Sequence, residues 1–287
     1  MMRMGIVGAE NSHSWGIASE LNIRKAIPGF CVTHIWGETE EFAKNAAEQG
    51  KIPNIVQKPE DMISKVDCVM IDHRDGKYHF AAAKSFIKAG IPTFIDKPIT
   101  VSLAEAKKLM AYRKKYGVPI TTMSSVPHQA CVKNFKKELQ KIGDVRVAHM
   151  SGPGDANSPY SGIFFYGIHQ TDLMVELFGT DMMDATAVKH EGRFNGIIRY
   201  KNGLVVTINM APVNGFAISA VGSKGGFYAP VVYDKHMGLP VAKIINRMFK
   251  TRKEPFSDAR MLAPIAALEA LNKSIKIGRT IPVPTVC

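Results

Sequence analysis

The sequence predicts an α/β domain with a doubly wound parallel sheet, followed by an α+β domain on a mostly antiparallel open sheet. Between residues 4 and 122, short apolar strand-like runs alternate with helical patterns, which is typical of a parallel sheet. From residue 185 onwards, short alternating runs are joined by Gly and Asn turns, which is typical of antiparallel strands. The change of pattern places the domain boundary after residue 123, with a first domain of 1–123 and a second of 124–287.

The first strand and the segment after it have the layout of a nucleotide-binding unit. Residues 4–8 form an apolar run, and a helical pattern follows over 14–26 before Pro28 and Gly29. In the Rossmann fold, a turn between such a strand and helix receives the pyrophosphate of a dinucleotide. Its G-x-G-x-x-G fingerprint keeps only the first glycine here. We predict that the turn binds the cofactor through Gly8, Ala9, Glu10, Asn11, Ser12 and His13.

An acidic residue follows the second predicted strand, which covers 31–36 and precedes a helix over 40–49. An acid at this point binds the adenosine ribose in Rossmann domains. Glu38 has two interpretations, as that ribose ligand or as a helix-start acid near the helix dipole. The first would favour NAD, because a carboxylate repels the 2′-phosphate of NADP. The surplus of positive charge points towards NADP, so the expected cofactor is NAD or NADP, with NAD slightly preferred.

Polar residues follow the next two predicted strands, at 66–72 and 92–95. The carboxyl ends of parallel strands line the ligand crevice of an open sheet. We therefore assign cofactor contacts to His73, Arg74, Asp96 and Lys97. A strand-end lysine taken alone is most often a solvated surface charge, so the rest of the chain decides the role of Lys97. Helices over 58–63, 78–89 and 102–116 and a strand over 118–122 complete this domain.

The second domain is predicted to hold helices over 129–140 and 162–178 and strands over 144–151, 185–190, 196–200, 204–209, 217–221 and 226–229. Two further helices cover 237–249 and 258–276, the second interrupted at Pro264. His169 and Asp172 lie three residues apart on the largely apolar helix 162–178, so they share a face. His169 is either a satisfied core histidine or a functional base.

Composition excludes several classes of protein. Four separated cysteines (Cys31, Cys68, Cys131 and Cys287) make no C-x-x-C pair, which argues against a disulfide framework or a zinc site and for a reducing cytoplasm. No apolar run has the length of a membrane span, and the N-terminal run is too short for a signal peptide. The net charge of +12 is spread over short clusters at helical spacing, and no nucleic-acid-binding motif is present. We expect neither a membrane nor a nucleic-acid partner.

The motifs along the chain, taken in sequence order, resemble those of the Gfo/Idh/MocA oxidoreductases, a family named for glucose–fructose oxidoreductase and inositol dehydrogenase. The family's E-K-P appears as Asp96, Lys97 and Pro98, its G-x-H-x-x-D helix at 167–172, and its late G-[ST]-x-G turn at 222–225. The resemblance implies an NAD(P)-dependent dehydrogenase acting on a CH–OH group of a sugar, cyclitol or related polyol. It also implies a homodimer or homotetramer formed through the exposed face of the second sheet.

The resemblance further implies roles for three residues. Lys97 would orient the reacting hydroxyl and lower its pKa. His169 would take the proton as general base while hydride leaves for the nicotinamide. Asp172 would hold the imidazole or contact the substrate.

The sequence departs from the family pattern near the same site. Phe165 stands where many members carry an aspartate, Glu10 stands in the glycine-rich turn, and His73 and Arg74 replace a T-P pair. Two explanations are open. Either the substrate differs, with His73, Arg74 or His128 supplying the missing polar group, or the protein is a non-catalytic ligand-binding or regulatory member.

Overall fold

The chain divides into two compact units in the computed structural model, which describes residues 1–286. The first unit comprises Met1–Thr100, Ala104–Met123 and His236–Ser257, and the second comprises Val101–Leu103, Ser124–Lys235 and the residues from Asp258 onwards. One break between the units falls after Met123. The segment 236–257, predicted as part of the second domain, belongs to the first unit. Cys287 lies outside the described residues.

The first unit holds the predicted parallel sheet, which the structure confirms. Its six strands run in the order β3-β2-β1-β4-β5-β6 with parallel pairing throughout. β4 and β5 are buried along their whole length, as expected for strands covered on both faces. The strands are β1 (Met2–Val7), β2 (Phe30–Trp36), β3 (Asn54–Ile55), β4 (Cys68–Ile71), β5 (Thr93–Ile95) and β6 (Ile120–Thr122).

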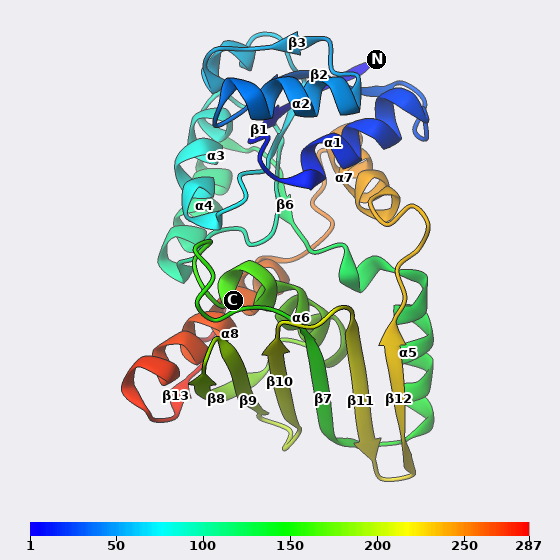
Figure 1. Cartoon of the computed structure of the whole chain (residues 1–287), viewed down its shortest axis with the longest axis vertical. Helices are drawn as coiled ribbons and strands as arrows, with labels where there is room; N and C mark the ends of the chain where they lie inside the picture. Colours follow the sequence, from blue (N-terminus) through cyan, green and yellow to red (C-terminus); the bar gives the residue numbers. More distant parts are fainter. Residues whose placement is uncertain (287) are drawn as a thin grey trace. The chain divides into compact units, whose positions relative to one another are not determined.

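The helices of this unit include one from the far end of the chain. Phe249 of α7 packs edge-on against Phe30 of β2 with ring centroids 6.1 Å apart, and Ile245 and Met248 join the same core. Figure 1 shows α7 beside α1, which explains why 236–257 belongs to this unit. The helices are α1 (Ser12–Ala18), α2 (Glu40–Gly50), α3 (His79–Lys88), α4 (Leu103–Tyr116) and α7 (Leu239–Thr251), with short turns η1 (Ser19–Ile23), η2 (Pro59–Met62) and η3 (Gly76–Tyr78).

The helix predicted over 14–26 is shorter than expected. α1 ends at Ala18 and passes into the wider π-type turn η1, which ends at Ile23. Lys25 then adopts a left-handed backbone conformation with φ of 52°, which a continuing α-helix does not allow.

The second unit holds a mixed seven-stranded sheet in the order β12-β11-β7-β10-β9-β8-β13. The predicted antiparallel pairing holds except where β10 pairs with β7 in parallel. β7 comes earlier in the chain than its neighbours and lies between β11 and β10, so the sheet is not a simple meander. The strands are β7 (Val145–Pro153), β8 (Met182–His190), β9 (Arg193–Tyr200), β10 (Val205–Ala211), β11 (Phe216–Gly222), β12 (Gly225–Val231) and β13 (Ile281–Pro282).

Helices cover one face of this sheet and leave the other open (Figure 1). They are α5 (Ala130–Lys141), α6 (Phe164–Phe178) and α8 (Asp258–Ile277), with the short turn η4 (Val126–His128) before α5. α8 continues through Pro264, where the sequence predicted an interruption. Buried apolar residues on both sides of Pro264, from Met261 to Leu271, hold the helix against its neighbours despite the lost backbone donor. None of the helices within residues 1–286 meets the length and apolarity that crossing a membrane requires.

Candidate functional site

The turn after β1 passes directly against the end of β4, and only glycine allows this. Gly8 has a φ of 110°, and a Cβ there would lie 2.5 Å from the carbonyl carbon of Asp72 and from the amide nitrogen of His73. A side chain is therefore excluded by both backbone conformation and space. The predicted first glycine of the nucleotide turn is needed for the close packing of the loops at the carboxyl ends of β1 and β4.

Glu38 binds the backbone of the same turn. Its Oε2 accepts the N–H groups of Ala9 at 2.8 Å and Glu10 at 3.1 Å. Its Oε1 is buried and has no hydrogen-bond partner within residues 1–286. A buried carboxylate oxygen left unsatisfied is costly, so this oxygen needs a donor such as a ribose hydroxyl. The residues present thus fit the adenosine ribose of a dinucleotide.

The charge of Glu10, which stands where a glycine is usual, is balanced locally. Its Oε1 lies 3.6 Å from Nη1 of Arg74 in the loop after β4. The guanidinium reduces the repulsion that an unpaired carboxylate would exert on a pyrophosphate. Ser12, at the start of α1, is exposed.

A buried polar network links the ends of β1, β4 and β5. Oδ2 of Asp96 contacts Nδ1 of His13 at 3.0 Å and lies 3.7 Å from Nζ of Lys97. The side-chain amide of Asn11 bridges the two carboxyl groups: its Nδ2 donates to Oδ2 of Asp96 at 3.2 Å and to Oδ1 of Asp72 at 3.0 Å. Lys97 is 6% exposed, so it is not the solvated surface lysine of the simpler interpretation.

The two carboxyl groups of this network differ in protonation. Burial, and after it the charge of Asp96, raises the pKa of Asp72 well above its usual value. Burial opposes ionisation of Asp96 too, but the charges of His13 and Lys97 outweigh it and hold the pKa of Asp96 below its usual range. As pH rises, Asp72 therefore keeps its proton longer than Asp96 does.

His13, Asp72 and Asp96 also place one potential metal-ligand atom each within 4.8 Å of one another. Asn11 and Lys97 direct N–H donors at the same carboxyl groups. A cation would have to displace or oppose these donors, so the set of groups favours a proton-sharing network over a metal centre.

Two histidines shape the loop after β4. His73 packs between Trp36, with ring centroids 5.8 Å apart, and Tyr78 at the same distance. Burial lowers the pKa of His73 to about 4, so the ring is neutral at pH 7. The fully buried His79 contacts the carbonyl oxygens of His73, through Nε2 at 2.9 Å, and Pro98, through Nδ1 at 2.7 Å. It thereby ties the loop of His73 to the loop of Lys97.

The second unit contains His169 on α6. The Nδ1 of His169 hydrogen-bonds Oγ of Ser124 at 2.7 Å, and that Oγ also accepts the N–H of Val126 at 3.1 Å. The imidazole is 7% exposed. Ser124 therefore contacts the ring at Nδ1.

Asp172 contacts the residues around the imidazole rather than the ring. Its Oδ2 accepts the N–H of Ser124 at 2.7 Å, and its Oδ1 pairs with Nη1 of Arg260. Arg260 also bonds Glu176 at 3.2 Å. These contacts give Asp172 a positioning function, since it fixes the residue that holds His169. The nearby His128 has its pKa lowered by burial, which outweighs the charge of Asp172.

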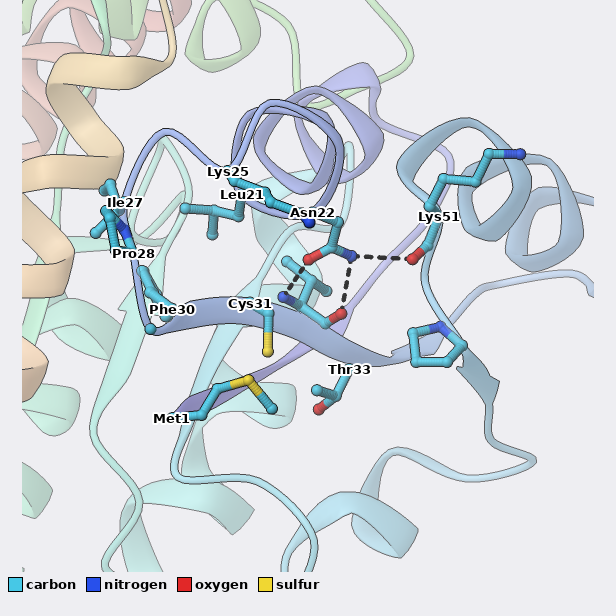
Figure 2. Close-up of a pocket in the computed structure, with 13 residues that line it drawn as sticks. Met1, Leu21, Asn22, Lys25, Ile27, Pro28, Phe30, Cys31, Thr33 and Lys51 are labelled. Atoms are coloured by element: carbon cyan, nitrogen blue, oxygen red, sulfur yellow. Dashed lines mark hydrogen bonds between the residues drawn. The ribbon is translucent and has the colours of Figure 1, made fainter.

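A pocket of about 630 Å³ lies elsewhere in the first unit, at the amino end of β2 (Figure 2). Leu21, Ile27 and Phe30 line it, and Asn22 closes one side through hydrogen bonds to the backbone of Val32 and Lys51. In a parallel sheet the amino ends lie opposite the carboxyl ends, so this pocket is separate from Asp96 and Lys97.

The structure thus brings most of the predicted cofactor residues together in the first unit. They are Gly8, Ala9, Glu10, Asn11, His13, Glu38, His73, Arg74, Asp96 and Lys97. His169 and Asp172 lie in the second unit. Asp72, Ser124 and Arg260 also contact these residues and were not among the predicted site residues. Asp72 ends the predicted strand 66–72 and Ser124 closely follows the last strand, so their position was a usable signal. Arg260 pairs with Asp172, which lies 88 residues earlier in the chain, so no local sequence signal pointed to it.

Comparison with known proteins agrees with the resemblance. Residues 2–124 match the sequence model of the GFO_IDH_MocA oxidoreductase family, described as having an NAD-binding Rossmann fold. An uncharacterised oxidoreductase of Escherichia coli (strain K12), YhhX, is 31% identical over 124 residues, which is 39% of this chain and 34% of that protein. The match spans about a third of the length of the curated relatives.

Solved structures resemble the whole chain in fold. Apo scyllo-inositol dehydrogenase from Lactobacillus casei aligns with a TM-score of 0.84 and 13% identity, covering 99% of this chain and 98% of that one. GenD2 from gentamicin A biosynthesis, in complex with NAD, aligns with a TM-score of 0.83 and 15% identity, covering 99% and 97%. The chain therefore shares its fold, with one parallel and one mostly antiparallel sheet, with these solved structures.

Proposed function

We propose that this chain, a member of the Gfo/Idh/MocA oxidoreductase family by its first 124 residues, is an NAD(P)-dependent dehydrogenase. It moves a hydride between the nicotinamide and a CH–OH carbon of a sugar, cyclitol or related hydroxylated ring. The observation that carries the proposal is Glu38, which binds the nucleotide turn with one oxygen and leaves the other buried without a partner. The same carboxylate favours NAD over NADP, because a 2′-phosphate would meet its charge.

The bound nicotinamide supplies the hydride acceptor. The ammonium of Lys97 contacts the reacting hydroxyl and lowers its pKa, as a cation beside a developing alkoxide does. His169 takes the hydroxyl proton at Nε2 while its Nδ1–H donates to Ser124. With a nicotinamide bound to accept the C–H hydride, transfer of the O–H proton to His169 would complete oxidation of the alcohol to a ketone. Asp172 keeps Ser124 in place for this step.

The cofactor assignment is tested by titrating NADH and NADPH against the purified protein and following nicotinamide fluorescence. We expect NADH to bind more tightly than NADPH. Glu38→Gln should reduce or reverse that preference, because it removes the charge but keeps the shape of the side chain. Equal affinities in the wild type, unchanged in the variant, would contradict the role of Glu38. Failure of both nucleotides to bind would favour the non-catalytic alternative.

The catalytic assignment is tested with Lys97→Met and His169→Ala. Each should lower turnover by about 10²- to 10⁴-fold, the usual contribution of a positioned acid–base group. Thermal melts should show that both variants fold. Full activity in both would remove these residues from the mechanism, and ligand binding without any change in nicotinamide absorbance would favour a regulatory protein.

The open face of the second sheet is proposed as the homodimer or homotetramer contact. The strand register places Val147, Ile197, Val221 and Tyr228 on one face, and they are 44%, 45%, 53% and 72% exposed. Exposed apolar side chains on a contiguous sheet face are typical of protein–protein contacts. Light scattering during gel filtration should give at least twice the mass of the chain, and Tyr228→Lys should lower it.

The proposed location is the cytoplasm. Cys31, Cys68 and Cys131 are free thiols, which persist in a reducing compartment.

A further inference from the structure

Aromatic rings surround the imidazole of His169 within the second unit. The ring of Phe165 lies 4.9 Å from those of Tyr160 and Tyr166, measured between centroids. The ring centroids of Tyr166 and Phe216 each lie 5.7 Å from that of the His169 imidazole. These four residues, Tyr160, Phe165, Tyr166 and Phe216, form what is called here the aromatic cluster.

The cluster reaches from the buried imidazole to the surface. Phe165 and Tyr166 lie four and three residues before His169 on α6, so all three project from one side of the helix. Phe216 is buried at 7% exposure, whereas Tyr166 is 39% exposed and Phe165 is half-buried. A ligand that reaches His169 from the surface would therefore meet aromatic carbon beside the base.

The acidic groups of the same helix are committed to other partners. Asp172 uses one carboxylate oxygen for the N–H of Ser124 and the other for Arg260. Glu176 is paired with Arg260 and Lys136. The residues of α6 that lie beside His169 towards the surface are thus aromatic, while the carboxylates of α6 are held in hydrogen bonds and ion pairs within the second unit.

We propose that the substrate is a cyclic alcohol with two unlike edges, a hydroxylated edge at the reacting carbon and an apolar CH₂ edge against Phe165 and Tyr166. This proposal rests on the dehydrogenase function proposed above and narrows its substrate class. A hydroxyl group pressed against Phe165 would lose its hydrogen bonds to water and gain none. Aliphatic ring carbons instead bury apolar surface against the aromatic rings.

The test compares two ligands with the same six-membered ring, cyclohexane-1,2-diol and myo-inositol. Binding to the full-length protein with NADH is measured by saturation-transfer NMR and calorimetry, so the readout does not depend on turnover. We expect the diol to bind about tenfold more tightly or better, in the range that one unmatched group in an apolar pocket produces. Phe165→Asp should reverse the preference, and the matched control Phe165→Leu should keep it.

Each result decides the question. Equal or tighter binding of myo-inositol to the wild type, or no binding of the diol, overturns the proposal. The same holds if Phe165→Asp, shown to fold by its thermal melt, leaves the ratio of affinities unchanged. Preference for the diol and its reversal in the variant would support the substrate class. If the diol then fails to reduce NAD⁺ in a separate absorbance assay, the dehydrogenase function is contradicted.

Discussion

Asp72 makes the electrostatics of the first unit testable. It is fully buried, with Oδ1 bonded to Asn11 and Oδ2 without a hydrogen-bond partner among the described residues. Burial and the neighbouring Asp96 raise its pKa well above the usual value. We predict that Asp72→Asn stabilises the first unit at neutral pH, because an amide keeps the shape and the contact to Asn11 without the cost of holding a proton.

The sign and size of the effect follow from proton linkage. In the unfolded chain Asp72 ionises near pH 4, whereas in the folded protein it keeps its proton to higher pH. The folded state then binds more protons than the unfolded state, so stability falls as pH rises above about 4 until the folded pKa is passed. The slope is about 1.4 kcal/mol per pH unit. The advantage of Asp72→Asn should grow at that rate and vanish near pH 4.

Urea unfolding between pH 4 and pH 8 measures this directly. The chain has two tryptophans, Trp15 and Trp36, and both lie in the first unit, so their fluorescence reports its unfolding. Asp96→Asn is the matched control with the opposite sign. The ionised form of Asp96 is favoured in the fold, so its contribution is present above about pH 4 and is lost as pH falls. An advantage of Asp72→Asn that does not change with pH, or a loss of stability at every pH, would refute the reasoning.

Three further predictions concern other parts of the molecule. Arg260→Met should destabilise the second unit by about 3–5 kcal/mol, because it weakens the pairing of two carboxylates: the buried Asp172 loses Arg260, and Glu176 keeps only Lys136. Lys136→Met, which removes an exposed cation from Glu176, should cost at most about 1 kcal/mol. Equal losses of thermal stability in the two variants would contradict the reasoning that the buried cation matters more than the exposed one. His73 should show no NMR titration between pH 5 and pH 8, since its pKa is lowered to about 4, and a midpoint near 6.5 would show that it is solvated. Ser124→Ala should lower kcat roughly 10- to 100-fold with little change in KM, because it removes the partner of the imidazole but no substrate contact; a change in KM alone would place Ser124 at the substrate instead.

Several parts of the candidate site could be predicted because their signals are local. A strand, a turn with Gly8 and a helix are neighbours in the chain, and so are the strand 92–95 and Lys97. The three-residue spacing of His169 and Asp172 predicts a shared helix face regardless of the rest of the fold. The sequence already assigned Lys97 to the cofactor site together with His169 and the nucleotide-like turn, whereas its burial to 6% exposure is not contained in any local pattern.

Other parts required the tertiary structure. Asn11 joins Asp72 to Asp96 across 61 and 85 residues, and this contact exists because β4 lies between β1 and β5 in the sheet. The order of strands also decides that Asp72 and Asp96 share a buried site and have pKa values shifted in opposite directions. No spacing in the sequence carries that information, because a pKa depends on what burial and charge surround the group.

From the sequence alone, the two sheet types and the order of the elements could be predicted, as could the glycine turn after β1 and the shared helix face of His169 and Asp172. These follow from periodicity and turn chemistry, which act over a few residues. Only the tertiary structure decided that α7 returns to the first unit, that β7 enters the second sheet between later strands, and that Arg260 holds Asp172. Each of these depends on packing between segments tens of residues apart, where burial of apolar surface and pairing of buried charge select one arrangement.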